Sequence, residues 1–285
     1  EREANLTRIN PKLTLNLPGI GMGSVESGIK TLPGVVSRNE LSSQYSVRGG
    51  NFDENLVYVN EIMIFRPILI RSGQQEGLSF INPDLVSSIL FSSGGFDARY
   101  GDKMSSVLDI KYKRPQQFAA SVNVSLLGAS AHFEDRSKNQ KFSIISGARY
   151  KNNSLVFKNL DESGVYSPMF ADFQTQLTYQ LNSKHNIGAI GYFAMNKYTF
   201  KPQRRESVFG SIGQQYVLNI EFEGFEDDRY TTFMGAVWDT WAPNEKTKVK
   251  CIYSLYKSVE RESFDILSAY NLGDLNDSKD GKSMP

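Results

Sequence analysis

Apolar and polar residues alternate with a period of two along much of the second half of the chain. In residues 117–126 one face carries Phe, Ala, Val, Val and Leu, and the other carries Gln, Ala, Ser, Asn and Ser. Residues 172–182 alternate in the same way, with an entirely polar second face. A helix cannot use a period of two, so the pattern predicts half-buried strands. Less regular alternation predicts further strands at 141–150, 186–200, 229–242 and 247–260.

The apolar phase slips by one residue after Leu126, which requires a reversal or a bulge at Leu127–Gly128. With this reversal, the second half of the chain is predicted to hold about seven strands. Short polar connections at 135–140, 182–185 and 243–247 alternate with long ones at 151–170 and 201–228, and a polar tail follows about residue 261. Short turns on one side and long loops on the other are typical of an outer-membrane barrel. A soluble β-sandwich remains the alternative, because alternation alone cannot tell whether the apolar face meets lipid or a second sheet.

The first part of the chain is richer in turn signals. Gly49 and Gly50 permit a positive φ in a tight turn after Arg48, and Asn51 and Asp53 can cap that turn. Further along, Asn82 can cap a short helix that has Pro83 at its first position. Strands are predicted at 56–60, 89–92 and 107–112.

Composition divides the chain near Pro115. Residues 1–115 hold 9 aromatic residues and residues 116–285 hold 25, so two domains are the simplest interpretation. The formal charge of +1 and the lack of a basic block argue against a nucleic-acid partner. No apolar run is long enough for a membrane-spanning helix. The chain begins with Glu rather than Met and has a single cysteine, Cys251, so we expect a processed or partial sequence without an internal disulfide.

Six motifs in residues 31–110 occur in an order that resembles the plug domain of TonB-dependent outer-membrane receptors, of the type common in Bacteroidetes. Segments of the second region, 147–150, 170–174 and 222–224, also resemble the opening of that family's barrel. The six motifs are Thr31–Val35, Ser46–Gly50, Val57–Asn60, Ile81–Asp84, Gly94–Gly101 and Ser105–Ile110.

The resemblance implies a mixed fold. A small α+β plug domain at 1–115 is followed at 116–285 by the first antiparallel strands of a transmembrane β-barrel, which has about 22 strands in the family. About seven strands cannot close around a folded plug, and an open sheet edge in lipid would leave backbone groups unsatisfied. We therefore expect the barrel to be incomplete in this chain.

The resemblance also implies function, partners and location. The protein is expected to be a receptor or transporter in the Gram-negative outer membrane that takes up an unidentified substrate in a gated, energy-coupled way. The TonB complex of the inner membrane and outer-membrane lipids are the implied partners, with a surface lipoprotein or other outer-membrane subunits as further candidates. The alternative is a structural or accessory barrel subunit of a larger outer-membrane assembly, without active uptake.

Arg48 matches an arginine that in this family pairs with barrel glutamates and locks the plug, and Arg99 is the candidate for a second locking position. The plug segment Arg48–Asn55, which contains Gly49, Gly50, Asn51 and Asp53, is expected to approach the ligand together with loop 201–228. An aromatic girdle at the membrane interface is predicted from Tyr230, Trp238 and Trp241.

Enzymatic chemistry finds no support in the sequence. His132 and His185 are the only imidazole groups, and neither has a serine or cysteine nucleophile in a recognisable setting, so solvated histidines are expected. No catalytic residue, metal site or cofactor is predicted.

Overall fold

The computed structural model describes residues 6–11, 24–37, 43–65, 67, 78–102, 104–152, 154, 164–211 and 214–274. The chain forms two compact units. The first consists of Glu1–Lys151, Phe170–Asn196 and Thr231–Val259, and the second of Asn152–Met169, Lys197–Tyr230 and Glu260–Pro285. Among the described residues, no helix is both long enough and apolar enough to cross a membrane.

The N-terminal region builds a small five-stranded sheet in the order β1-β6-β7-β4-β5. Strands β4 and β7 run parallel, with Asn55 opposite Ser106, and the other pairs of this sheet are antiparallel. A separate antiparallel pair joins β2 to β3. The bounds are β1 Thr7–Ile9, α2 Val25–Ile29, β2 Val35–Val36, β3 Ser46–Val47, η1 Phe52–Glu54, β4 Asn55–Val59, β5 Ile62–Met63, η2 Pro83–Leu85, β6 Val86–Ser92 and β7 Ser106–Tyr112.

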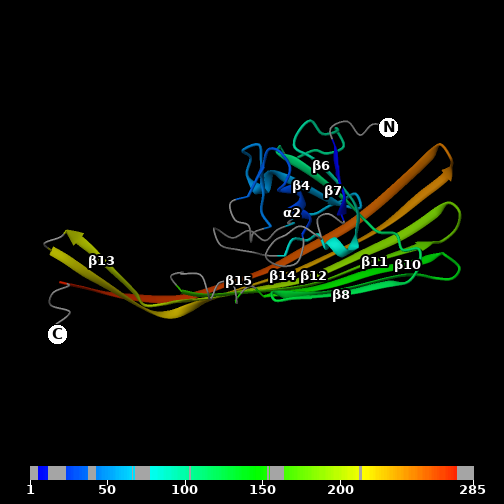
Figure 1. The fold of residues 1–285 in the computed structure, drawn as a ribbon. Coiled ribbons are helices and arrows are strands. Elements are labelled where there is room, and N and C mark those ends of the chain that lie inside the picture. The colour runs from blue at the N-terminus through cyan, green and yellow to red at the C-terminus, as the bar shows by residue number, and fades with distance from the viewer. Residues whose placement is uncertain are drawn as a thin grey trace. The chain divides into compact units, whose positions relative to one another are not determined.

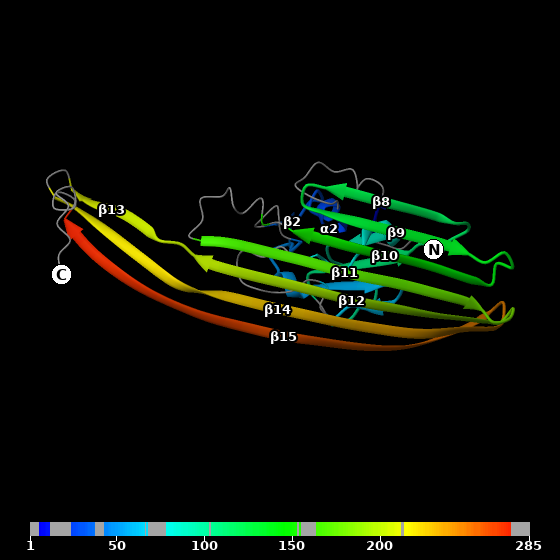
Figure 2. The same cartoon turned by 90° about the horizontal axis from the view of Figure 1, so that it is seen from below.

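Eight strands form a large sheet in the second part of the chain. The order is β13-β14-β12-β11-β10-β9-β8, with β15 paired to β14 (Figure 2). The predicted reversal after Leu126 is a two-residue turn, because Ser125 pairs with Gly128. The bounds are β8 Ala119–Ser125, β9 Gly128–Arg136, β10 Phe142–Asn152, β11 Gly164–Gln180, β12 His185–Pro202, β13 Arg205–Ser211, β14 Gln214–Asn244 and β15 Thr247–Asp274.

In the first unit the N-terminal region packs against one face of the large sheet (Figure 1). Its core residues, such as Ile29, Leu85 and Ile89, form one continuous apolar cluster with Ile145 of β10 and Ile190 of β12. Each fully buried aliphatic side chain contributes about 1.5–3 kcal/mol relative to an exposed one. The hydrophobic cores of the two sheets are therefore shared rather than separate.

The two faces of the large sheet have the reverse of the polarity expected in a soluble protein. On β11, Phe173 is 47% exposed, whereas its neighbours Asp172 and Gln174 are 5% and 0% exposed. Phe193 and Val237 are likewise exposed on their strands. An apolar outer face and a polar inner face are the pattern of a transmembrane barrel, in which the outer face meets lipid. This arrangement favours the barrel over the β-sandwich.

The predicted long loop at 201–228 and the predicted polar tail after about residue 261 are both wrong. Residues 201–228 contain β13 and the first half of β14, which pair from Arg205–Ile220 to Ser211–Gln214, and β15 continues to Asp274 where a polar tail was predicted. The signal was present, because Leu218, Ile220 and Phe222 alternate with polar residues. Of the predicted loop 151–170, residues 155–163 lie outside the described part, and Gly164 already begins β11.

Candidate functional site

The segment Ser79–Asp84 of the N-terminal region is bound to the large sheet by several side chains. Its local shape is set by Asn82, whose side-chain Oδ1 accepts a hydrogen bond from the Asp84 backbone N–H at 3.1 Å and caps η2. Pro83 follows in the first position, where its missing N–H costs nothing. The predicted cap is thus confirmed, with a 3₁₀ turn in place of an α-helix.

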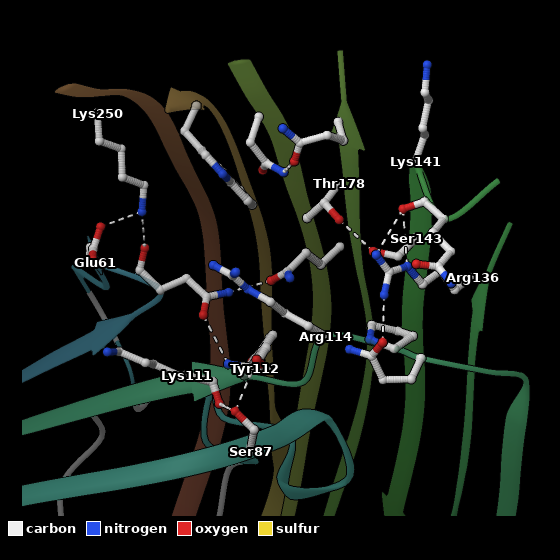
Figure 3. A pocket seen from close by; sticks show the side chains of 18 of the residues that line it. Glu61, Ser87, Lys111, Tyr112, Arg114, Arg136, Lys141, Ser143, Thr178 and Lys250 are labelled. Atoms are coloured by element: carbon white, nitrogen blue, oxygen red, sulfur yellow. Dashed lines mark hydrogen bonds and ion pairs between the residues drawn. The ribbon is translucent and has the colours of Figure 1, made fainter. Parts of the chain in front are cut away.

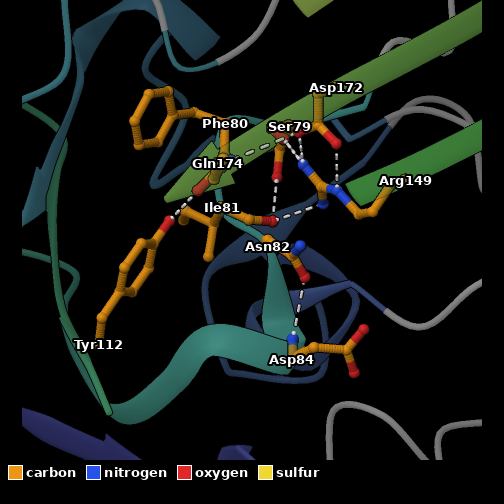
Figure 4. A network of polar contacts seen from close by, with 9 residues as sticks. All are labelled: Ser79, Phe80, Ile81, Asn82, Asp84, Tyr112, Arg149, Asp172 and Gln174. Carbon is orange, nitrogen blue, oxygen red and sulfur yellow. Dashed lines mark hydrogen bonds and ion pairs between the residues drawn. The ribbon is translucent and has the colours of Figure 1, made fainter. Parts of the chain in front are cut away.

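Arg149 of β10 reaches from the large sheet to this segment (Figure 4). Its Nη1 donates to the carbonyl oxygen of Ile81 at 2.8 Å, and its Nη2 donates to that of Ser79 at 2.7 Å. On its other side the guanidinium binds the Asp172 carboxylate of β11 through two bonds, one of them from Nε to Oδ1 at 2.9 Å. The side chains of Arg149 and Asp172 are 5% and 1% exposed, so the pair is shielded from water.

Gln174 of β11 binds the carbonyl of Phe80, which lies between the carbonyls of Ser79 and Ile81. Its Nε2 donates to the carbonyl oxygen of Phe80, and its Oε1 accepts from the Tyr112 hydroxyl at 2.6 Å. Three consecutive carbonyls, those of Ser79, Phe80 and Ile81, are therefore satisfied by two side chains of the large sheet. Buried backbone carbonyls are costly to leave unpaired, so this set fixes the segment in place. We call Ser79, Phe80, Ile81, Arg149, Asp172 and Gln174 the carbonyl anchor.

Close packing supports the carbonyl anchor at its edges. Gly147 lies two residues before Arg149, and a β-carbon there would overlap the Asn82 amide and come within 3.2 Å of Leu85 Cδ2. Ser130 of β9 donates its hydroxyl to Asp84 Oδ2 at 3.1 Å. Glycine at 147 is thus required for the approach of the two sheets.

A buried carboxyl lies close to the anchor. Glu26 of α2 is 2% exposed. Burial raises the pKa of Glu26 above its usual 4.5, and a hydrogen bond from Ser79 and the charge of Arg149 offset this only in part.

A second, more exposed contact joins the turn between β4 and β5 to the large sheet. Asn60 and Glu61 both adopt positive φ, at 53° and 70°, as a tight hairpin turn requires. Lys250 of β15 donates to the Asn60 carbonyl at 3.2 Å and binds the Glu61 carboxylate, and the Asn60 amide donates to Gln176. Partial burial raises the pKa of Glu61, but the hydrogen bond and charge of Lys250 outweigh it and leave the pKa below its usual 4.5. We call Asn60, Glu61 and Lys250 the turn tie.

The structure brings three of the family-like motifs together around Arg48. Arg48 is exposed, has φ 49°, and donates its backbone N–H to the Gly34 carbonyl at 2.8 Å. A β-carbon on Gly94 would lie 3.3 Å from its Nη1. Gly49 follows with φ 82°, and a side chain at Gly50 would overlap the Ser105 hydroxyl. The locking role of Arg48 stays a prediction.

The remaining turn residues and Arg99 lie apart from the carbonyl anchor. Asn51 caps η1, its Oδ1 accepting from the Phe52 N–H at 3.0 Å, and Asp53 is an exposed member of that turn. The exposed Arg99 guanidinium stacks 4.7 Å from the centre of the Tyr100 ring. Roles of these residues in binding or locking also stay predictions.

Of the three girdle candidates, only Trp241 is exposed, at 44%. Trp238 is 8% exposed, belongs to the shared apolar cluster and packs against Gly188, while Tyr230 is 4% exposed and donates its hydroxyl to Glu262 at 2.7 Å. An interface girdle needs rings that reach the headgroups, which Tyr230 and Trp238 do not offer in this arrangement. The girdle stays a prediction for Trp241.

The histidines are not simply solvated, as the sequence suggested. His132 is 7% exposed and lies 3.0 Å from Glu134 Oε2, and the half-buried His185 lies 2.8 Å from Asp239 Oδ2. Both therefore serve as paired structural groups. Within the described ranges, no cluster of His, Cys, Asp or Glu could hold a metal ion.

Sequence reasoning missed the roles of Arg149, Asp172 and Gln174. These residues belong to the motifs 147–150 and 170–174. The sequence linked both motifs to the opening of a barrel but predicted no contact for them. The usable signal was Asp172, the single charged residue of β11, together with Arg149, which lies between the uncharged Ala148 and Tyr150 in β10. Charged groups in transmembrane strands face the interior, where they must find partners.

Comparisons with known proteins agree with this architecture. Residues 17–107 match the family model of the TonB-dependent receptor plug domain. No curated protein matches the chain. Among solved structures, the ferric enterobactin receptor of Pseudomonas aeruginosa is 12% identical with a TM-score of 0.51, over 95% of this chain and 49% of that one.

Two further solved structures have similar coverage. The siderophore receptor PirA from Acinetobacter baumannii is 11% identical with a TM-score of 0.48, over 93% of this chain and 58% of its own. The outer membrane transporter YddB from Escherichia coli is 10% identical with a TM-score of 0.49, over 92% and 45%. The chain thus spans about half the length of the solved structures it matches.

Proposed function

We propose that the protein is a TonB-dependent receptor that takes up its substrate through a plugged barrel, because residues 17–107 match the family model of the TonB-dependent receptor plug domain. The fold is that of a plug followed by antiparallel strands of a partial receptor barrel, located in the Gram-negative outer membrane. We propose domain limits of 1–115 for the plug and 116–285 for the barrel portion. The Bacteroidetes-type assignment stays a prediction.

The observation that carries this proposal is the carbonyl anchor. A plug that blocks a pathway must be held against the barrel wall at rest, and Arg149 and Gln174 hold it through the backbone of Ser79–Ile81. Hydrogen bonds to backbone carbonyls are directional but not covalent, so an applied force can break them as a set. The family acts with TonB, which we propose supplies that force.

The proposed cycle involves no covalent chemistry. Substrate binds from outside, near the plug segment Arg48–Asn55, and its differential affinity for two plug states favours engagement of TonB. TonB then pulls the plug until the carbonyl anchor opens. Specificity would lie in contacts outside the anchor, and the substrate itself is not assigned.

Exposure of Ser79 measures whether the plug leaves the wall. Ser79 is 3% exposed at rest, so a Ser79→Cys variant in a Cys251→Ser background should resist a maleimide reagent. In energised cells that contain TonB, labelling of Cys at 79 should rise; in cells without TonB, or treated with an uncoupler, it should stay low. Met104→Cys, at a site that is 84% exposed, serves as the matched control and should be labelled equally in all conditions.

The accessory-subunit alternative makes the opposite prediction. If the protein keeps the receptor fold without active uptake, labelling at 79 will be the same with and without TonB.

A permeability assay tests whether the plug blocks a pathway. Deleting the plug should make liposomes that contain the barrel more permeable to a small neutral sugar. Unchanged permeability would show that the plug blocks no pathway.

A further inference from the structure

A cavity of about 760 Å³ lies between the plug and the barrel wall within the first unit (Figure 3). The plug contributes the turn at Asn60–Glu61 and the end of β7. The wall contributes the parts of β9 to β12, β14 and β15 that lie next to the short turns. The connection from plug to barrel, with Arg114, Pro115 and Gln116, also lines it. The cavity is separate from the carbonyl anchor, none of whose members lines it.

The lining of this cavity carries far more positive than negative charge. Its cations are Lys111, Arg114, Arg136, Lys141, Lys248 and Lys250, and Glu61 is its single carboxylate. Where several charges of one sign line a hollow with low-dielectric walls, they concentrate counter-ions of the opposite sign. The cavity should therefore attract anions.

These six cationic side chains are not equally available to bind an anion. Lys250 is engaged by Glu61, and Arg136 donates to the Gln140 carbonyl and to Gln116 Oε1 at 2.6 Å. Lys111 and Lys141 extend away from the middle of the cavity (Figure 3). Arg114 extends into the middle. Glu61 and Lys250 lie on one side of it, and Arg136 and Ser143 lie on the other (Figure 3). Among the described residues, the Arg114 guanidinium has no hydrogen-bonding or ion-pair partner.

The groups around Arg114 suit an oxygen-rich ligand. Amides from Gln176, Gln180 and Asn186 and hydroxyls from Ser143 and Thr178 line the wall side. An arginine fork matches the two oxygens of a carboxylate or phosphate, and such charge-assisted bonds are about twice as strong as neutral ones. The Gln180 amide already donates to two backbone carbonyls, and the Ser143 and Thr178 hydroxyls are bonded to each other. The Gln176 amide uses only its oxygen in the contact with Asn60, so its Nε2 can donate to a remaining oxygen of the ligand.

We propose that this cavity is a binding site for a small oxyanion, a carboxylate or phosphate compound, and that Arg114 is its principal ligand. This goes beyond the proposed uptake function, because binding to a resting plug needs neither TonB nor substrate from outside. The anion would lie on the short-turn side of the plug, between plug and wall. The anion would contact both the plug and the barrel wall and would stabilise their association.

The test is direct binding of two probes, citrate and inorganic phosphate, to the receptor purified from outer membranes in detergent. Titration calorimetry at low salt should show saturable binding of at least one probe to the unaltered protein. Replacing Arg114 by Gln should weaken it by about tenfold or more, the equivalent of about 1.4 kcal/mol. Arg114→Lys should retain an intermediate affinity, since it keeps the charge but loses the fork.

The matched control is Lys138→Gln, which removes a cation from the neighbouring turn but not from the cavity lining. Its affinity should stay within about twofold of the unaltered protein. The proposal is overturned if neither probe binds, or if Arg114→Gln binds as well as the unaltered protein, or if Lys138→Gln loses as much as Arg114→Gln. Citrate binding alone would identify a carboxylate site and phosphate binding alone a phosphate site. Because TonB is absent, failure here leaves the labelling test of uptake unaffected.

Discussion

Two of the polar contacts between the plug and the wall have opposite character. In the carbonyl anchor, Arg149 and Asp172 are 5% and 1% exposed, and the guanidinium is shared between a carboxylate and two plug carbonyls. In the turn tie, Lys250 and Glu61 are 22% and 56% exposed. Both contain an ion pair, but water screens only the second.

This difference in exposure decides how each contact responds to change. Breaking a buried pair leaves an uncompensated charge and is expensive, whereas an exposed pair contributes little and weakens with salt. Of these two contacts, the carbonyl anchor therefore contributes more to keeping the plug in place, and the turn tie adjusts the position of one hairpin. Five predictions test this contrast.

The largest effect is expected from Arg149→Met. The substitution leaves Asp172 buried without its partner and removes the donors to Ser79 and Ile81, which should lower the free energy of unfolding by about 3–5 kcal/mol. Thermal unfolding in detergent, followed by calorimetry, measures the loss. Arg204→Gln, which removes an exposed arginine 3.9 Å from Glu221, should change stability by less than about 0.5 kcal/mol.

The double variant Arg149→Met/Asp172→Leu separates charge burial from plug binding. With both charges gone, much of the loss should be recovered, because a buried ion pair can often be replaced by apolar residues. A deficit of about 1–3 kcal/mol should remain from the unpaired plug carbonyls. Full recovery would mean that Arg149 serves only Asp172 and does not hold the plug.

A smaller loss is expected from Gly147→Ala. The added methyl would overlap Asn82 and press on Leu85, forcing η2 away from β10 at a cost of about 1–3 kcal/mol. Gly101→Ala, where the new β-carbon has no heavy atom within 4 Å, is the matched control and should be close to neutral. Equal melting temperatures for the two variants would contradict the close approach of plug and wall.

Glu26→Gln should alter how stability depends on pH. Because burial raises the pKa of Glu26 above 4.5, the folded protein keeps its proton at pH values where the unfolded chain has lost it. Its contribution is fully present below pH 4.5 and is lost as the pH rises through the folded pKa. The variant should therefore be more stable than the unaltered protein at neutral pH, with the gain vanishing in acid. A gain that is independent of pH would exclude titration of Glu26 as its cause.

The smallest effect is expected from Lys250→Gln, which removes the turn tie. The loss of stability should be no more than about 1 kcal/mol and should disappear in 1 M salt, where the screening length is about 3 Å. Because the pKa of Glu61 lies below its usual value, the contribution of the tie should also fall as the pH falls through that pKa. Lys246→Gln, in the adjacent turn, is the control. A loss as large as that of Arg149→Met would remove the distinction between the two contacts.

Much of the framework follows from local rules that the sequence carries openly. Period-two alternation identified the strands of the wall, the phase slip after Leu126 identified a reversal, and Asn82 followed by Pro83 identified a capped turn. The same rule was overlooked at 214–228, where alternation extends β14 into a predicted loop. These features depend on neighbouring residues, so no knowledge of distant contacts was needed.

The sequence alone thus determined strands, turns and the order of plug and barrel, whereas tertiary structure decided which groups meet. Arg149 lies 68 residues from Ile81 along the chain, and only the register of β10 and the packing of the plug bring its guanidinium to that carbonyl. Strand pairing likewise turned Trp238 toward the plug and left Trp241 exposed. The period of a strand decides on which face of the sheet a side chain lies. The residue that this side chain contacts depends on the register of the strands and on how the plug packs against the wall, and both are set by the total burial of the two sheets.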